Sequence, residues 1–141
     1  MTARLFVSGG AAALLLFACG SAVCAEPFPF DRDLLLDAAP MRPGKRMPML
    51  NVETNGNARI DLWCRTVPAR VAVADAAIKI EAGPLPETAP EMQSAAQCTP
   101  ERMQADEQLL AVLLESNAWR AEGPVIVLDG PKPLKFRLSD H

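Results

Sequence analysis

The stretch CTPERMQADEQLLAVLLESN, residues 98–117, predicts one amphipathic helix, and this helix decides the fold class. Thr99 supplies a hydroxyl for the N-cap, and Pro100 occupies the first helical position, where an N–H group is not needed. We expect the helix to run to about Ser116, with Asn117 as a left-handed terminator.

One face of this helix is expected to lie in the core, because apolar residues recur along it at helical spacing. They are Met103, Leu110, Leu113 and Leu114. Arg102 and Asp106 are four residues apart, so we interpret them as a surface ion pair of little energetic value.

The segment before the helix predicts a β-hairpin. Residues 50–54 and 57–64 flank Asn55-Gly56, a pair that favours the type I′ turn of a two-residue hairpin. Strand alternation then turns Cys64 toward the core and Trp63 toward the opposite face.

Further short strands are expected on both sides of the helix. They are residues 71–73, 78–80, 125–128 and 134–138, and residues 118–120 lie between the helix and a turn at residues 122–124. The first two flank Asp75-Ala76 and form a second hairpin. Because several short strands surround one helix, the sequence predicts an α+β fold with an antiparallel sheet.

The domain is expected to span residues 47–141. Residues 26–46 are rich in proline and are interpreted as irregular structure that wraps the domain, with only residues 33–38 long enough for a short helix or strand. Residues 83–97 contain three prolines and no apolar period, so we expect a long loop that ends at Cys98.

The N-terminal residues 1–25 are typical of a secretory signal peptide. A positive charge at Arg4 precedes a short apolar run, and small residues end at Ala25. An alternative is a lipoprotein signal, because the residues before Cys19 resemble a lipobox and would make Cys19 a lipidation site. The protein is expected to be periplasmic or secreted, and in the alternative to be anchored in a membrane.

The cysteines that would remain after cleavage at Ala25 are Cys64 and Cys98. In an oxidising compartment two thiols of one small domain usually pair, so we expect a structural disulfide. Two buried free thiols remain an alternative. A redox or metal role is less favoured, because the chain has no Cys-x-x-Cys motif and no Cys/His cluster.

Composition argues against several function classes. The only histidine is His141 at the end of the chain, which argues against histidine-based catalysis and histidine metal sites. The chain has 14 basic and 17 acidic residues and no tyrosine, so we do not expect it to bind nucleic acid. The mature serines lack an activating base, and we expect no catalytic residue and no cofactor.

Two further groups of side chains are interpreted as having no role in catalysis or metal binding. Carboxylate pairs such as Asp106/Glu107 have no neighbouring nucleophile and are interpreted as solvated surface. Met41, Met47 and Met49 offer thioether sulfurs to Cu(I), but methionines more often fill gaps in a core.

The candidate binding patch comprises Trp63, Arg65 and Trp119. A tryptophan on the polar face of a strand beside an arginine is typical of an exposed recognition surface. The alternative is that the proline-rich segment covers Trp63.

Three stretches resemble the META domain of the HslJ-like family of exported bacterial proteins. They are Ile60-Asp61-Leu62-Trp63-Cys64, the run from Cys98 to Glu107 with the leucines that follow, and Leu134-Lys135-Phe136. The similarity spans about residues 47–139, although Trp63 and Arg65 replace the family's glycine and asparagine. It implies a cone- or barrel-like antiparallel sheet packed against one helix, in proteins tied to envelope stress tolerance and without established enzymatic activity.

These observations predict a non-enzymatic module of the cell envelope with a binding or stress-protective role. The expected partner is an envelope protein, a peptide or a small molecule, and a membrane only if Cys19 is lipidated. The alternative function is a lipid-anchored structural accessory of an envelope assembly.

Overall fold

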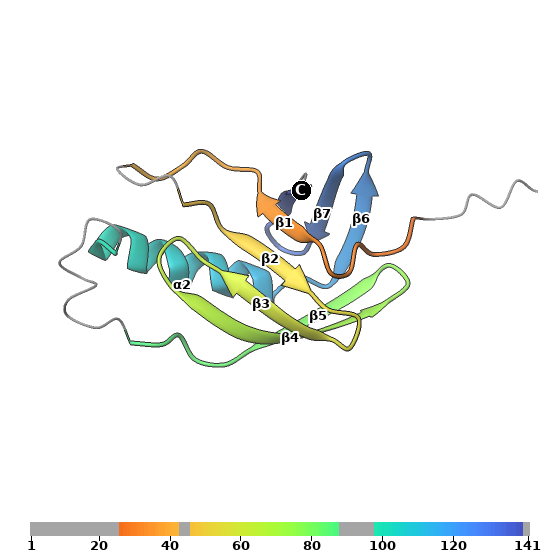
Figure 1. Cartoon of the computed structure of the whole chain (residues 1–141), viewed down its shortest axis with the longest axis horizontal. Coiled ribbons are helices and arrows are strands. Elements are labelled where there is room, and N and C mark those ends of the chain that lie inside the picture. Colours follow the sequence, from red (N-terminus) through yellow and green to blue (C-terminus); the bar gives the residue numbers. More distant parts are fainter. Residues whose placement is uncertain (1–25, 43–45, 88–97, 140–141) are drawn as a thin grey trace, which may run out of the picture.

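The computed structural model describes residues 26–42, 46–87 and 98–139. The predicted α+β fold is confirmed in this part of the chain, which forms a closed antiparallel barrel and a helix (Figure 1). The elements are β1 (Asp33–Leu36), β2 (Met49–Val52), β3 (Asn57–Asp61), β4 (Thr66–Ala74), β5 (Ala77–Ala82), α2 (Pro100–Leu114), β6 (Ala118–Glu122), β7 (Val125–Asp129) and β8 (Leu134–Leu138).

The barrel is a meander in which each strand pairs with the next one along the chain and β1 pairs with β8. Both predicted hairpins before the helix are present, as β2–β3 and β4–β5. The two strands predicted after the helix are present as β7 and β8, and the structure adds β6, which contains residues 118–120. The described helix is too short and too polar to cross a membrane.

The proline-rich segment 26–46 contains β1, which lies within residues 33–38, the part expected to be long enough for a short helix or strand. Leu34 of β1 is opposite Leu50 of β2 on one side and opposite Leu138 of β8 on the other. β1 therefore closes the barrel, and the structural domain begins upstream of residue 47.

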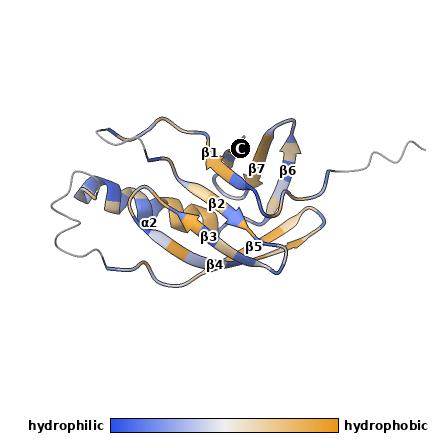
Figure 2. Ribbon diagram, viewed as in Figure 1, coloured by the Kyte–Doolittle hydropathy of each residue, from blue (hydrophilic) through white to orange (hydrophobic). Residues whose placement is uncertain are grey.

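The core lies inside the barrel, as the alternation of buried and exposed residues along the strands requires. Figure 2 shows this alternation of hydrophobic and hydrophilic residues along β4. The helix adds Leu109, Leu110 and Leu113 to the same buried cluster. Among the largest buried side chains contributed by the barrel are Leu34, Leu50, Ile60, Val67, Leu128 and Phe136.

The buried face of the helix differs from the predicted one. Leu114 is 41% exposed, whereas Arg102 and Asp106 are 2% and 0% exposed. The expectation of a solvated ion pair, and of a solvated carboxylate at Asp106, is therefore wrong. The true buried stripe is Arg102, Asp106, Leu109, Leu110 and Leu113, in which polar side chains take the first two positions.

The β2–β3 turn also differs from the predicted type I′ geometry. That turn needs a positive φ at both central residues, but only Gly56 of the Asn55-Gly56 pair has one, at 89°. The Gly56 N–H donates to the Glu53 carbonyl at 3.0 Å. The turn is thus one residue longer, and the glycine forms a bulge after it.

The barrel has its narrowest seam between β5 and β6, where the register pairs only Ala77 with Ala118. Two backbone hydrogen bonds flank this pair, from Ile78 N–H to the Asn117 carbonyl at 3.1 Å and from Trp119 N–H to the Ala76 carbonyl at 2.9 Å. The seam therefore joins the β4–β5 turn to the start of β6.

Asn117 is not the left-handed terminator that the sequence suggested. The helix has Glu115 as its C-cap in the right-handed region, and Asn117 is not among the residues with positive φ. Its N–H donates to the Asp129 carbonyl at 2.9 Å. The residue links the helix to the sheet through its backbone instead.

Candidate functional site

The expected disulfide between Cys64 and Cys98 is present and confirmed, with 5.2 Å between the Cα atoms. Cys64 lies in the turn between β3 and β4, and Cys98 directly precedes the helix N-cap Thr99. Thr99 accepts a hydrogen bond from the Arg102 N–H, as the capping pattern predicted. The bridge therefore attaches the β3–β4 turn to the start of α2.

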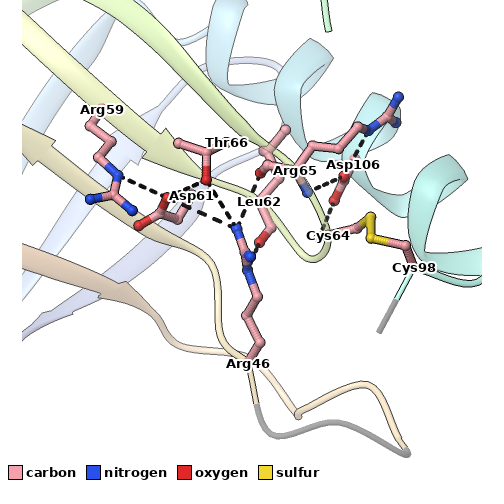
Figure 3. Close-up of polar contacts among 9 residues, drawn as sticks. All are labelled: Arg46, Arg59, Asp61, Leu62, Cys64, Arg65, Thr66, Cys98 and Asp106. Atoms are coloured by element: carbon pink, nitrogen blue, oxygen red, sulfur yellow. Dashed lines mark hydrogen bonds and ion pairs between the residues drawn. A yellow bond between two sulfur atoms is a disulfide. The ribbon is translucent and has the colours of Figure 1, made fainter. Parts of the chain in front are cut away.

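A buried carboxylate attaches the same turn to the helix a second time (Figure 3). Asp106 accepts hydrogen bonds from Cys64 N–H at 3.0 Å, from Arg65 N–H at 2.9 Å and from Arg65 Nε at 3.1 Å. Arg65 also donates to the Met103 carbonyl at 2.8 Å. We call Cys64, Arg65, Cys98 and Asp106 the turn clamp.

The outer side of the turn is held by a second set of polar contacts. Arg46 donates to the Leu62 carbonyl at 3.0 Å and to Thr66 Oγ1 at 3.2 Å. Asp61 accepts from Arg59 Nε at 3.0 Å and from Thr66 Oγ1 at 2.7 Å. The carboxylates of Asp61 and Asp106 thus have hydrogen-bond partners within the protein. We therefore interpret the surroundings of the β3–β4 turn as a structural region that holds the fold together.

The predicted patch of Trp63, Arg65 and Trp119 is not an exposed surface. Both tryptophans are 9% exposed, and the Arg65 side chain is 10% exposed. Trp63 is two residues beyond Asp61, the last residue of β3, so strand alternation no longer applies to it. Arg65 bonds to Asp106 of α2, whereas Trp119 Nε1 donates to the Asp75 carbonyl of the β4–β5 turn at 2.7 Å. Trp63 and Arg65 therefore lie in the β3–β4 turn, whereas Trp119 lies in β6 beside the β4–β5 turn, so the three do not form one patch.

Trp119 instead forms part of a pocket at one end of the barrel. We call this the aromatic pocket; it lies between the β4–β5 turn, β6 and the chain around residues 26–30. Its volume of about 800 Å³ falls within the usual range for small-molecule sites. Its apolar lining comprises Pro27, Phe28, Phe30, Val73, Ala76, Trp119 and Ala121.

The aromatic rings of the pocket are held in place by one another. The Phe28 ring meets the Trp119 ring edge to face at a centroid distance of 5.2 Å and lies 5.0 Å from the Phe30 ring. Phe28 is 5% exposed and belongs to the core cluster. The inner wall of the pocket is therefore continuous with the core and fixed before any ligand arrives.

The charged lining residues are Glu26, Asp75 and Arg120. Arg120 forms ion pairs with Glu122 at 2.9 Å and with Asp129. Its hydrogen bonds to Asp129 and Glu122 raise the pKa of the guanidinium. Glu26 and Asp75 are exposed, and within the described residues neither carboxylate has an ion-pair or hydrogen-bond partner.

A second, more polar pocket of about 530 Å³ shares Phe30 and Val73 with the aromatic pocket. Its cations are Arg70, which donates to Asn57 Oδ1 at 2.7 Å, and Lys79, which pairs with Glu81 at 3.1 Å. The two pockets meet at the Phe30 side chain.

The sequence signalled Trp119 but not the pocket around it. Phe28 and Phe30 lie in the proline-rich segment and carry no local pattern that places them beside β6. Their position follows from β1, which brings the N-terminal segment into the barrel.

The remaining sequence predictions concern the N-terminus, the long loop, the C-terminal histidine, the methionines and metal binding. The signal peptide, Cys19, part of the loop at 83–97 and His141 lie outside the described residues. Met41 and Met47 pack against the core cluster, as gap-filling methionines do. No group of three metal-binding side chains of the His, Cys, Asp or Glu type occurs in the described ranges.

Comparisons with protein-family models, with curated proteins and with solved structures found no match.

Proposed function

We propose that this chain is a non-enzymatic binding module of the bacterial cell envelope, of the META-domain type, that takes small apolar molecules into the aromatic pocket. The observation that carries the proposal is the pocket itself, with its three aromatic side chains and a volume suited to a small ligand. A stress-protective role would follow from sequestering such molecules.

The rest of the molecule supports a binding role through rigidity. The turn clamp and the closed barrel fix the strands that carry the pocket walls. A site formed before binding loses less entropy when it takes up a ligand. The polar side chains at the β3–β4 turn serve this scaffold, so they are not the binding residues.

The pocket is tested most directly through Trp119 fluorescence. The chain has two tryptophans and no tyrosine, so a Trp63→Phe background leaves Trp119 as the only strong fluorophore. We expect 4-phenyl-1-butanol to change the Trp119 emission in a saturable manner. In the same background, Ala76→Leu should weaken this binding about tenfold, because leucine fills space at the pocket wall.

Ala74→Leu is the matched control. Ala74 is exposed in the same hairpin and is not a lining residue of the pocket. Its affinity for the alcohol should equal that of the background protein. Emission changes that do not saturate, or that are equal in the two leucine variants, would exclude the pocket as the binding site.

The envelope location has its own test, which also separates the two functional alternatives. We expect the protein recovered from the envelope to begin at Glu26 and to gain the mass of two protons on reduction, as one disulfide requires. Intact mass before and after reduction measures both. A chain beginning at acylated Cys19 would instead support the lipid-anchored structural accessory.

A further inference from the structure

We infer that the aromatic pocket selects ligands that carry a cationic group beside an apolar body. This inference rests on the proposed function and adds the ligand class. It follows from three features of the pocket. In the part of the chain that the structure describes, two lining carboxylates lack partners, the one lining arginine is already in ion pairs, and aromatic rings lie next to the carboxylates.

The carboxylates of Glu26 and Asp75 are the lining charges that lack partners among the described residues. An apolar ligand that covers them removes water from a charged group without replacing its hydrogen bonds, which is unfavourable. A ligand with an ammonium group supplies the missing charge and the missing donors. The carboxylates therefore favour a cation over a neutral molecule of the same shape.

Arg120 does not cancel this preference. Its guanidinium is already engaged by Glu122 and Asp129, both of which lie outside the pocket lining. These three residues carry one positive and two negative charges, so an anionic ligand would meet no free cation there. Binding a carboxylate at Arg120 would require one of its ion pairs to break.

The aromatic rings add to the attraction for a cation. The faces of tryptophan and phenylalanine carry negative potential, and a cation within about 6 Å of a ring centroid is stabilised by it. Phe28, Phe30 and Trp119 all line the space next to the carboxylates. A cationic group with an apolar body thus finds complementary surfaces in one pocket.

Cleavage after Ala25 would place the α-ammonium of the mature chain at Glu26. This group adds one positive charge, against the two carboxylates of Glu26 and Asp75. Together with Arg120 and its ion-pair partners Glu122 and Asp129, these groups still carry a net negative charge, which is larger at pH values above the ordinary pKa of an α-amino group, about 7.7–8.0.

Three compounds with the same phenylbutyl body test the inference: 4-phenylbutylamine, 4-phenyl-1-butanol and 4-phenylbutyrate. Trp119 emission in the Trp63→Phe protein beginning at Glu26 gives the three dissociation constants at low salt. We expect the amine to bind about fivefold more tightly than the alcohol, and the carboxylate to bind most weakly. The advantage of the amine should shrink in high salt.

Asp75→Asn should remove most of this advantage, so that the amine and the alcohol bind the variant with nearly equal affinity. Asp75 has a φ of 53°, and asparagine tolerates this left-handed conformation as well as aspartate does. Asp31→Asn is the matched control, since Asp31 has a φ of 59° and does not line the pocket.

The outcomes separate the two proposals. If the alcohol binds and the amine binds no better, the cation preference is wrong and the binding function stands. If the carboxylate binds best, the preference is wrong in sign, and the Arg70 and Lys79 side of the adjoining pocket becomes the site to test. If none of the three binds, the proposed function fails and the inference fails with it.

Discussion

An Asp106→Asn variant should have a free energy of unfolding about 3–5 kcal/mol below that of the wild type. The carboxylate is fully buried and accepts three hydrogen bonds, two from backbone N–H groups and one from Arg65. Asparagine has one oxygen and directs an NH₂ group at a donor. The exchange therefore leaves a buried guanidinium without its counter-ion and a turn N–H without its acceptor.

Urea denaturation of the variant and the wild type measures this loss. Glu107→Gln is the matched control, because Glu107 is the next residue of the helix and is exposed. Its stability should stay within about 0.5 kcal/mol of the wild type. A loss below about 1 kcal/mol for Asp106→Asn would show that the β3–β4 turn does not depend on the carboxylate.

Removal of the disulfide by the double exchange Cys64→Ala and Cys98→Ala should lower the free energy of unfolding by roughly 4 kcal/mol. The bridge joins residues 34 apart in sequence, and the cost reflects the larger entropy of the unfolded chain without it. Both cysteines are buried, at 5% and 3% exposure, so alanine avoids placing a hydroxyl in the core.

The control for this variant is the wild type measured under reducing conditions, which should show a loss of similar size. A double variant as stable as the oxidised protein would mean that the turn clamp holds without its covalent part. Because the disulfide and Asp106 fix the same turn, their losses should not add independently. A variant that lacks both would lose most of the free energy of unfolding of a small domain, which is ~5–15 kcal/mol.

Local signals in the sequence predicted most of the secondary structure. Thr99 and Pro100 marked the helix start because capping depends on neighbours within one turn. The runs 71–73 and 78–80 marked the β4–β5 hairpin because both are rich in β-branched residues and only a short turn separates them. The disulfide followed from there being one pair of cysteines in the expected mature chain.

The candidate site was not predictable in the same way. Counting apolar residues gave only part of the buried face of the helix, Leu110 and Leu113, because its first two buried positions are polar. Their burial depends on partners far along the chain: Asp106 binds the β3–β4 turn, and Arg102 donates to the Met41 carbonyl. The aromatic pocket likewise arises only where residues 26–30 meet β6. Contacts between distant segments do not produce a periodic pattern in the sequence of either segment.

The pairing of β1 with β8 also sets the order in which the chain can fold. The three neighbouring hairpins β2–β3, β4–β5 and β6–β7 each join nearby residues, whereas the side chains of Asp37 and Arg137, which pair beside the closing seam, are 100 residues apart. Contacts of such long range form late, after local ones have reduced the loop to be closed. During synthesis from the N-terminus the barrel therefore stays open until Leu138 has emerged. β1 is then the first strand to appear and among the last to be paired on both edges.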